Sequence, residues 1–231
     1  MAGRREIRLL GNAPAAGGGR WVEVDPERLA GWLDRFAQRH GGIQHTTVTV
    51  HGLLVTAADG VHADCHILLG WRPEKVGDVR DGLAVDDLVA TALVDRRIGV
   101  LLARRGGFAV GIAEGTRITA SKVDSTYVQS RTAAGGWSQQ RFARRRQNQA
   151  RQAAQAAAEV AVRLLLPHIE RLEAVVAGGD RATIDAIMAD RRLEPLLAKR
   201  APRLLDVPDP RRHVLEAAPR LARAVRIHVS A

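Results

Sequence analysis

The sequence predicts a mixed α/β fold in which helices flank a mixed sheet, and three observations lead to this expectation. Alternating segments rich in β-branched residues occupy the first half of the chain, and short apolar segments alternate with helical periodicity in the second half. Of the 231 residues, 46% are hydrophobic, which is enough to bury a core. We therefore expect one folded domain over residues 21–231, preceded by a flexible leader over residues 1–20 that has no sustained periodicity.

A short strand and an amphipathic helix are expected at the start of the domain. Residues 21–24 are compatible with a strand, and Asp25 and Pro26 then provide an N-cap and a proline for the first helical turn. Gly41 and Gly42 are expected to end this helix. Its apolar residues are spaced to form one buried stripe: Leu29, Trp32, Leu33 and Phe36.

A group of strands, interrupted by one helix, is expected next. Residues 43–51 and 61–69 alternate between polar and apolar side chains, and Asp59-Gly60 is a turn signal, so we expect these two segments to pair. Helical spacing returns over residues 83–94. Three closely spaced segments then predict a β-meander: residues 98–103, 108–113 and 116–120.

The longest helix is predicted over residues 139–166, where the composition changes to Ala, Gln and Arg, and it ends near Pro167. Its expected apolar stripe consists of Phe142, Ala150, Ala153, Ala157, Val160 and Leu164. A strand over residues 173–177 follows, and Asp180 is placed to cap a helix that reaches Met188. The remaining expected elements are strands over residues 204–207 and 225–229 and a helix from about Pro210.

The net charge of the chain points to a polyanionic partner. It carries 35 Lys and Arg against 25 Asp and Glu, a formal charge of +10. The single cysteine, Cys65, cannot form an internal disulfide, and no group of Cys and His has zinc-finger spacing. No apolar run approaches the roughly 18 to 20 residues that a bilayer requires. We therefore expect a cytoplasmic protein with no cofactor, no metal and no membrane contact.

One predicted strand has the alternation of a metal site. His62, Asp64 and His66 share one of its faces, and Cys65 points to the other. A polar strand face exposed to solvent explains the same alternation, and no fourth ligand is evident, so we expect no metal here. Three tryptophans lie in periodic segments and are expected in the core rather than on a stacking surface: Trp21, Trp32 and Trp71.

The most uneven charge distribution lies between Asp124 and Glu159, where no acidic residue occurs. Within this stretch a polar segment with Gly135 and Gly136 runs into the start of the long helix. The N–H groups of a helix start and arginine side chains both bind phosphate, so contact with an RNA backbone is expected. A solvated helix face without a ligand is the alternative. The arginines of this stretch are Arg131, Arg141, Arg144, Arg145, Arg146 and Arg151.

The string GGWSQQRFARRR at residues 135–146 resembles the glycine-glycine-glutamine loop and following helix of eukaryotic and archaeal peptide-chain release factors. That loop belongs to their central, RNase H-like domain, and the resemblance covers roughly residues 98–229. The Gly-x-x-Gln spacing from Gly136 to Gln139 is instead similar to the Vms-like release factor (VLRF) family, and the chain looks like its actinobacterial branch. The resemblance implies an RNase H-like release-factor domain and a peptidyl-tRNA hydrolase of ribosome-associated quality control, which releases nascent chains from stalled large ribosomal subunits.

The resemblance also implies roles for individual residues. Gln139 is the catalytic residue that orients a water on the ester carbonyl, and Gln140 is the second candidate because the loop differs in length from the eukaryotic pattern. Gly135 and Gly136 allow the loop to enter a narrow ribosomal cavity. Trp137 either stacks on a terminal base or folds the loop back through a hydrophobic contact. The candidate RNA-binding residues are Arg131, near the CCA-end phosphates, and Arg141, Arg144, Arg145 and Arg146.

Two other functions fit the same residues. Related eukaryotic proteins are linked with cutting tRNA near its 3′ CCA end, which would make this chain a ribonuclease. A non-catalytic factor would instead bind the ribosome and only occupy the peptidyl-transferase centre. The implied partners are the large ribosomal subunit and the CCA end of peptidyl-tRNA.

Overall fold

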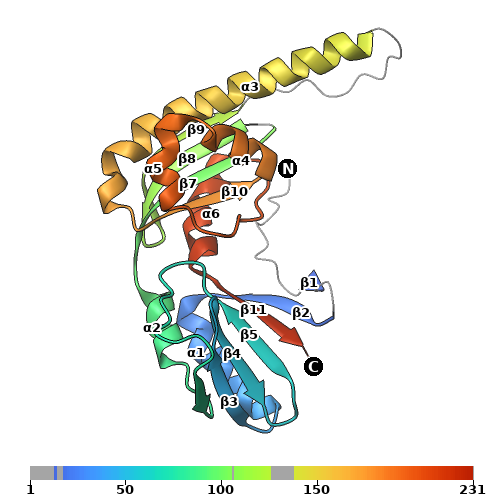
Figure 1. Cartoon of the computed structure of the whole chain (residues 1–231), viewed down its shortest axis with the longest axis vertical. Coiled ribbons are helices and arrows are strands. Elements are labelled where there is room, and N and C mark those ends of the chain that lie inside the picture. The colour runs from blue at the N-terminus through green and yellow to red at the C-terminus, as the bar shows by residue number, and fades with distance from the viewer. Residues whose placement is uncertain (1–12, 15–17, 106, 126–137, 231) are drawn as a thin grey trace, which may run out of the picture. The chain divides into compact units, whose positions relative to one another are not determined.

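The computed structural model describes residues 13–14, 18–105, 107–125 and 138–230, and its chain forms two compact units. Unit 1 consists of Met1–Val94 and Arg220–Ala231, and unit 2 consists of Asp95–Pro219. The mixed α/β class is as predicted from the sequence, with a sheet and flanking helices in each unit (Figure 1). The last strand of the chain, Val225–Ser230, returns to the sheet of the first residues, so unit 1 is built from two separate stretches of the sequence.

Unit 1 contains a seven-stranded antiparallel sheet in the order β1-β2-β11-β5-β4-β3-β6. Its strands are β1 (Ala13–Pro14), β2 (Arg20–Val24), β3 (Ile43–Val48), β4 (Gly52–Ala57), β5 (His62–His66), β6 (Val79–Asp81) and β11 (Val225–Ser230). The predicted pairing of residues 43–51 with 61–69 is wrong, because β4 lies between β3 and β5 and pairs with both. Asp59 and Gly60 form the turn from β4 to β5 instead. The run Gly-Leu-Leu-Val-Thr-Ala of β4 lacks clean polar alternation, so periodicity did not identify it.

Two helices, α1 (Pro26–Arg39) and α2 (Asp86–Leu93), pack against one face of this sheet. Leu29, Leu33 and Phe36 of α1 are buried as predicted, while Trp32 is half-buried and stacks on Phe36 with ring centroids 5.6 Å apart. The sheet side of this core consists of Val24, Val48, Leu53, Val55, Ala57, Ala63, Cys65, Val225 and Ile227.

Asp25 precedes α1 but does not cap it with its side chain, contrary to the sequence prediction. Its carboxylate instead accepts hydrogen bonds from Arg220 Nε at 3.0 Å and from a terminal nitrogen of the same guanidinium at 2.5 Å. A bidentate arginine pair satisfies both carboxylate oxygens, so it replaces the helix N–H groups as their partner. Sequence periodicity could not indicate this pair, because its members are 195 positions apart.

Unit 2 contains a mixed four-stranded sheet in the order β10-β7-β8-β9. Its strands are β7 (Arg97–Arg104), β8 (Gly107–Glu114), β9 (Arg117–Ser125) and β10 (Ala174–Gly179). The meander β7-β8-β9 is as predicted, and β10 adds in parallel to β7. The predicted strand over residues 204–207 is reduced to one bridge between Gly178 and Leu205, because prolines at positions 202 and 208 restrict further pairing on both sides.

The helices of unit 2 cover both faces of its sheet. They are α3 (Ser138–Leu165), the 3₁₀ segment η1 (Leu166–Arg171), α4 (Arg181–Met188), η2 (Arg191–Leu193), α5 (Glu194–Ala198) and α6 (Arg212–Arg223). Residues of α3 and α4 pack with Leu101, Val110 and Ile112 on one face. Leu215 of α6 lies over Gly111, which faces the opposite side by strand alternation. Among the described residues, no helix is both long and apolar enough to cross a membrane.

Asp180 caps α4 as predicted, since its carboxylate accepts hydrogen bonds from Thr183 N at 3.0 Å and from Thr183 Oγ1 at 2.5 Å. We expect Asp180→Ala to lower the free energy of unfolding by about 1 kcal/mol, because two donors lose their acceptor. Asp180→Asn, which keeps an acceptor oxygen, should lose clearly less. Urea denaturation of the three proteins measures the difference, and equal losses in both variants would contradict a capping role.

The Asp25–Arg220 pair makes the stability of the protein depend on acidity. Hydrogen bonding to Arg220 lowers the pKa of Asp25 below its ordinary value of 3.8. The stabilisation is therefore present above pH 3.8 and is lost as the pH falls through the lower, folded-state pKa. We expect Arg220→Met to cost no more than about 1 kcal/mol at pH 7 and to flatten the loss of stability below pH 4. Denaturation as a function of pH tests this, and parallel curves for the two proteins would contradict it.

Candidate nucleic-acid interface

Helix α3 positions the predicted site residues. It spans Ser138–Leu165, 28 residues, and an α-helix of this length is about 42 Å long. Every side chain at positions 148–152 is exposed, whereas buried positions begin at Ala154. The part of the helix before position 153 therefore extends about 22 Å from the packed core of unit 2 (Figure 1). We call residues 138–152 the helical arm.

Small residues attach the second half of α3 closely to the sheet. The residues of this half that are buried in unit 2 are Ala154, Ala157, Ala158, Val160, Ala161 and Leu165. Gly99 lies beneath its end, where an added Cβ would come within 3.2 Å of Leu172 and 3.4 Å of Leu165. The predicted stripe is partly wrong, since Ala150 is exposed and Leu164 is only partly buried. Ala157 and Val160 are buried as predicted, and Ala158, Ala161 and Leu165 are buried beside the predicted stripe, because the sheet covers a wider face of the helix than the stripe alone.

Polar contacts accompany the packing of the second half of α3 and of the segment that follows it. Glu159 of α3 accepts a hydrogen bond from Arg192 at 2.8 Å, and Arg192 also binds Asp190. Hydrogen bonds from Arg192 lower the pKa of Asp190 to about 2, so this carboxylate is charged at neutral pH. At the other end, Lys199 Nζ donates to the carbonyls of Ile169 and Leu172 at 2.8 Å each. The first contact therefore joins α3 to η2, and the second joins η1, which follows α3, to the end of α5.

The predicted site residues fall on the arm and on the segment before it. Gln139 and Gln140 occupy the first turn of α3, and Arg141, Arg144, Arg145 and Arg146 follow in the same helix. Positions 141, 144 and 145 have the i, i+3, i+4 spacing of one helix face. The side chains of residues 138–147 lie outside the described part of the structure. Arg131, Gly135, Gly136 and Trp137 lie wholly outside the described residues.

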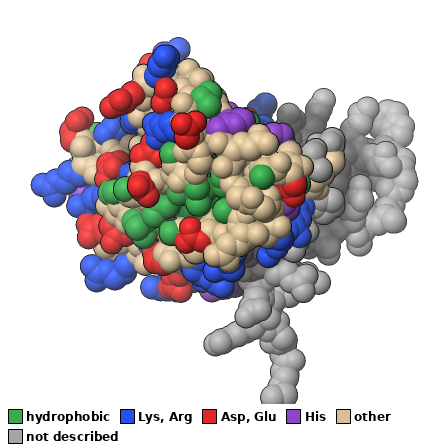
Figure 2. Space-filling view, turned by 90° about the horizontal axis from the view of Figure 1, so that it is seen from below, with side chains coloured by type: hydrophobic (Ala, Val, Ile, Leu, Met, Phe, Trp, Pro, Cys, Tyr) green, Lys and Arg blue, Asp and Glu red, His purple; other side chains and the backbone are tan. Residues whose placement is uncertain are grey.

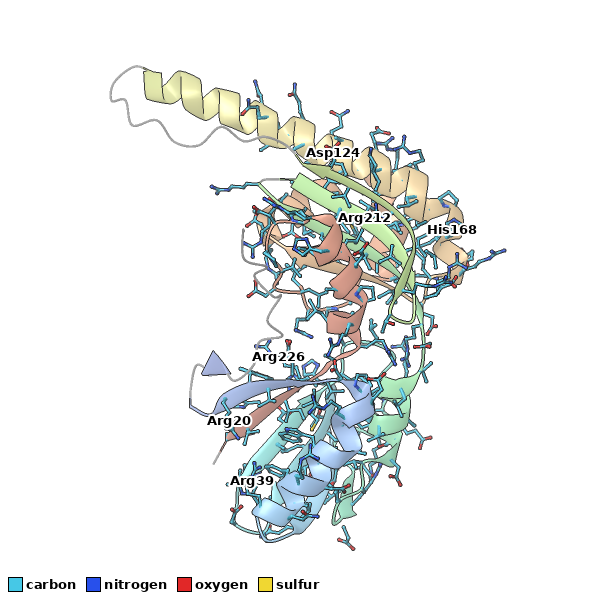
Figure 3. All side chains as sticks on the ribbon, turned by 180° about the vertical axis from the view of Figure 1, so that it is seen from behind. Arg20, Arg39, Asp124, His168, Arg212 and Arg226 are labelled. Carbon is cyan, nitrogen blue, oxygen red and sulfur yellow. The ribbon has the colours of Figure 1, made fainter. Side chains whose placement is uncertain are left out.

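Strand β9 precedes the segment that leads to the arm, and it ends at the same end of the sheet as the turn between β7 and β8. Ser125, the last residue of β9, pairs with Gly107 at the start of β8, and Asp124 lies beside it (Figure 3). Arg104, at the end of β7, donates from Nε to the carbonyl of Val207 at 2.6 Å and contacts Asp206 at 3.2 Å. Arg104 therefore has a structural role, while its neighbour Arg105 is exposed.

Positive charge is concentrated in unit 2. Its sequence contains 22 Lys and Arg against 13 Asp and Glu, whereas unit 1 contains 13 against 12. In the view of Figure 2, Lys and Arg side chains are interspersed with Asp and Glu side chains. The excess of arginine in unit 2 includes the stretch without acidic residues between Asp124 and Glu159, which contains the whole arm. A polyanion is therefore attracted to unit 2 far more than to unit 1.

A polar groove of about 410 Å³ is present elsewhere in unit 2, between β9 and α6. Arg117, Thr119 and Ser121 of β9 line one side, and Arg212 and Leu215 of α6 line the other. The groove contains none of the residues that the sequence marked for RNA binding or catalysis. The pair Arg211-Arg212 indicates a basic surface in the sequence without locating it, and only the fold brings Arg212 to the same groove as Arg117.

The suspected metal ligands of β5 have other partners. His66 Nε2 lies 2.8 Å from Asp64 Oδ2, and His62 Nδ1 lies 3.2 Å from Thr56 Oγ1. Within the described residues, no group of three or more His, Cys, Asp and Glu side chains has the geometry to hold a metal ion. Cys65 is fully buried, and burial raises the pKa of its thiol, so it is protonated at neutral pH.

Comparison with known proteins identifies a family that matches nearly all of unit 2 and part of the C-terminal stretch of unit 1. A family model described as the actinobacteria/chloroflexi VLRF1 release factor matches residues 96–228, more than half of the chain. No curated protein matches the chain.

Solved structures with low similarity come from archaea. The translation termination factor aRF1 is 17% identical over 73% of this chain and 51% of that chain, with a TM-score of 0.38. A second archaeal protein is 18% identical over 71% and 48%, with a TM-score of 0.36. Pelota from Archaeoglobus fulgidus is 12% identical over 93% and 65%, with a TM-score of 0.26. The chain spans about half of the length of the first two structures.

One substitution in the exposed arm should reduce the helix content of the protein without changing the stability of the folded core. We expect Ala150→Pro to reduce the circular dichroism signal at 222 nm while the Tm of the protein stays unchanged, because the exposed side chains around this position are not part of the core. Ala150→Ser is the matched control and should preserve both signals. A Tm lowered by several degrees in the proline variant would contradict a free arm.

Proposed function

Because the chain belongs to the actinobacteria/chloroflexi VLRF1 release factor family, we propose that it hydrolyses the ester bond of peptidyl-tRNA. By this reaction it releases nascent chains from stalled large ribosomal subunits, as a step of ribosome-associated quality control in the cytoplasm. The partners of the reaction are the large subunit and the CCA end of the peptidyl-tRNA.

The helical arm is the observation that carries this proposal. The ester of a peptidyl-tRNA lies in a cavity of ribosomal RNA that a globular domain cannot enter. A single α-helix is only about 10–12 Å wide with its side chains, and the arm extends about 22 Å before it meets the core. The segment with Gly135 and Gly136 directly precedes the arm, so the arm carries this segment at its end.

The arginines of the arm favour an RNA environment. Arg141, Arg144, Arg145 and Arg146 follow the first turn of α3, and the stretch from Asp124 to Glu159 has no acidic residue between its ends. Guanidinium groups bind phosphate oxygens in a bidentate manner, and the N-terminus of a helix adds a positive dipole end. Arg131 is proposed to bind the phosphates of the CCA end, and Trp137 to stack on its terminal base.

The reaction needs a positioned water and few other groups. The water oxygen bonds to the ester carbonyl carbon, the bond to the ribose oxygen breaks, and a proton passes to that oxygen through the ribose hydroxyls. Gln139 is proposed to orient the water with its side-chain amide, and its backbone N–H faces the developing oxyanion. Gly135 and Gly136 permit a close approach of the backbone to the substrate. Gln140 is the alternative for the role of Gln139.

Two glutamine variants and one matched control test the proposal. Large subunits that carry a labelled peptidyl-tRNA are incubated with wild type, Gln139→Ala, Gln140→Ala or Gln149→Ala. We expect Gln139→Ala to lower the rate of peptide release at least about 100-fold, since it removes the group that positions the water. Gln149, an exposed residue of the arm, should be replaceable without effect.

The tRNA product distinguishes the hydrolase from a ribonuclease, and the glutamine variants distinguish it from a non-catalytic ribosome-binding factor. Sequencing of the tRNA 3′ end should find an intact CCA, and a shortened tRNA would indicate a ribonuclease instead. Release that persists in both Gln139→Ala and Gln140→Ala would contradict the catalytic assignment. Reversing the charges of Arg144 and Arg145 to Glu should weaken binding to the subunit and reduce its dependence on salt.

A further inference from the structure

The sheet of unit 1 has a second face, which the proposed reaction does not use. Helices α1 and α2 pack against the face formed by Val24, Cys65 and Ile227. By strand alternation, the opposite face carries polar and aromatic side chains. The register places Trp21 of β2 opposite His228 of β11, and His228 opposite Asp64 of β5. The same register places Arg226 opposite His66.

Four rings form a continuous series across this face. The ring centroid of Trp21 lies 4.9 Å from that of His228 and 5.3 Å from that of His66. His66 lies 5.1 Å from His51, which belongs to the turn between β3 and β4. Trp21 is thus only half-buried on this polar face, contrary to its predicted place in the core. Four of the eight histidines of the chain lie here: His51, His62, His66 and His228.

A guanidinium group completes the aromatic series. The Cζ atom of Arg226 lies 4.2 Å from the ring centroid of Trp21, which is a cation–π contact. Arg226 projects from β11 between β2 and β5 (Figure 3). Its Nε atom is buried and has no hydrogen-bond partner among the described residues. The planar cation therefore lies among the rings, with its orientation set by stacking on Trp21.

Hydrogen bonds hold two of the rings in place. His66 Nε2 lies 2.8 Å from Asp64 Oδ2, and His228 Nε2 lies 3.0 Å from the carbonyl oxygen of Gly18. The side chains of His66 and Asp64 are 31% and 35% exposed, so the series is fixed in orientation but still accessible. Preorganised rings lose little conformational entropy when a flat ligand stacks on them.

We propose that this face, defined by Trp21, His51, His66, Arg226 and His228, binds unpaired nucleotides of RNA by base stacking. Aromatic side chains on an antiparallel sheet, with an arginine beside them, bind single-stranded nucleic acid through the faces of its bases. The guanidinium group of Arg226 complements the phosphates, and Asp64 and the imidazoles offer hydrogen-bond partners to base edges and to the 2′-hydroxyl. The core of a protein–protein interface is depleted in charged residues, whereas every side chain in this series except Trp21 is polar or charged, so the series fits a nucleic acid better than a protein partner.

This site is separate from the residues of the proposed hydrolase reaction, because it contains no residue of the helical arm. Trp21, His51 and His66 lie outside the range 96–228 that matches the family model, and Arg226 and His228 lie at the end of that range. A variant that loses RNA binding on this face would not contradict the catalytic role proposed for Gln139. A variant with no peptide release would likewise not contradict RNA binding on this face.

Fluorescence anisotropy with a labelled RNA octamer, U8 or A8, tests the proposal on the full chain. We expect Trp21→Ala to weaken binding about tenfold, because removal of one stacking platform costs roughly this factor or more. Trp21→Phe keeps a ring and should bind within about threefold of wild type. Trp32→Phe is the matched control, since Trp32 stacks on Phe36 of α1 and should not affect binding.

A spectroscopic measurement separates stacking from a structural role. RNA should quench the tryptophan emission of the wild type and of Trp32→Phe, and the quenching should be clearly smaller in Trp21→Phe despite similar affinity. Unchanged affinity in a folded Trp21→Ala variant, or equal quenching in Trp21→Phe, would overturn the proposal. Binding of a DNA octamer as tightly as RNA would overturn the assignment to RNA. The double variant Arg144→Glu, Arg145→Glu should keep the quenching that depends on Trp21, and its loss would place the RNA on the arm instead.

Discussion

The close contact between α3 and the sheet of unit 2 is the constraint on which the arrangement of the arm depends. Alanines at positions 154, 157, 158 and 161 allow the helix to approach the strands, and Gly99 leaves room for Leu165 where α3 ends. Larger residues on either surface would separate the two layers and change the direction of the helix. Because this contact ends at position 154, the helix continues beyond the core, and the side chains at positions 148–152 are all exposed.

The two units differ in net charge and in the kind of side chains that they expose. Unit 2 carries most of the excess of positive charge and presents it on an extended helix, which suits contact with a phosphate backbone. Unit 1 is close to electrically neutral and presents rings and one guanidinium group on a sheet face, which suits contact with bases. Phosphate contacts position a nucleic acid, whereas base contacts discriminate between sequences and between paired and unpaired strands.

Local patterns carried much of the fold and the position of the candidate site. The spacing of Leu29, Leu33 and Phe36 identified the buried face of α1, and Asp180 identified the start of α4 through its short-range cap. The meander and the long helix also follow from periodicity within single segments. The arm itself was not predictable, because exposure of Ala150 depends on where the sheet ends beneath α3. The arginine positions of the candidate site come from the charge pattern and its glutamine positions from the resemblance to release factors, and both stay predictions because these side chains lie outside the described residues.

The sequence by itself determined the elements whose cause lies within a few residues: helix periods, caps, turns and the stretch of arginines without acidic partners. Only the tertiary structure decided which sheet each strand joins, since β11 pairs with β2 and β5 across about 160 to 210 positions of the chain. It also decided that Asp25 binds Arg220 rather than its own helix, and that Trp21 lies on a polar face between His66 and His228. The strand pairing, the Asp25–Arg220 pair and the position of Trp21 all depend on segments that are distant in the sequence. A local pattern therefore does not indicate which strand or charged side chain will be the partner.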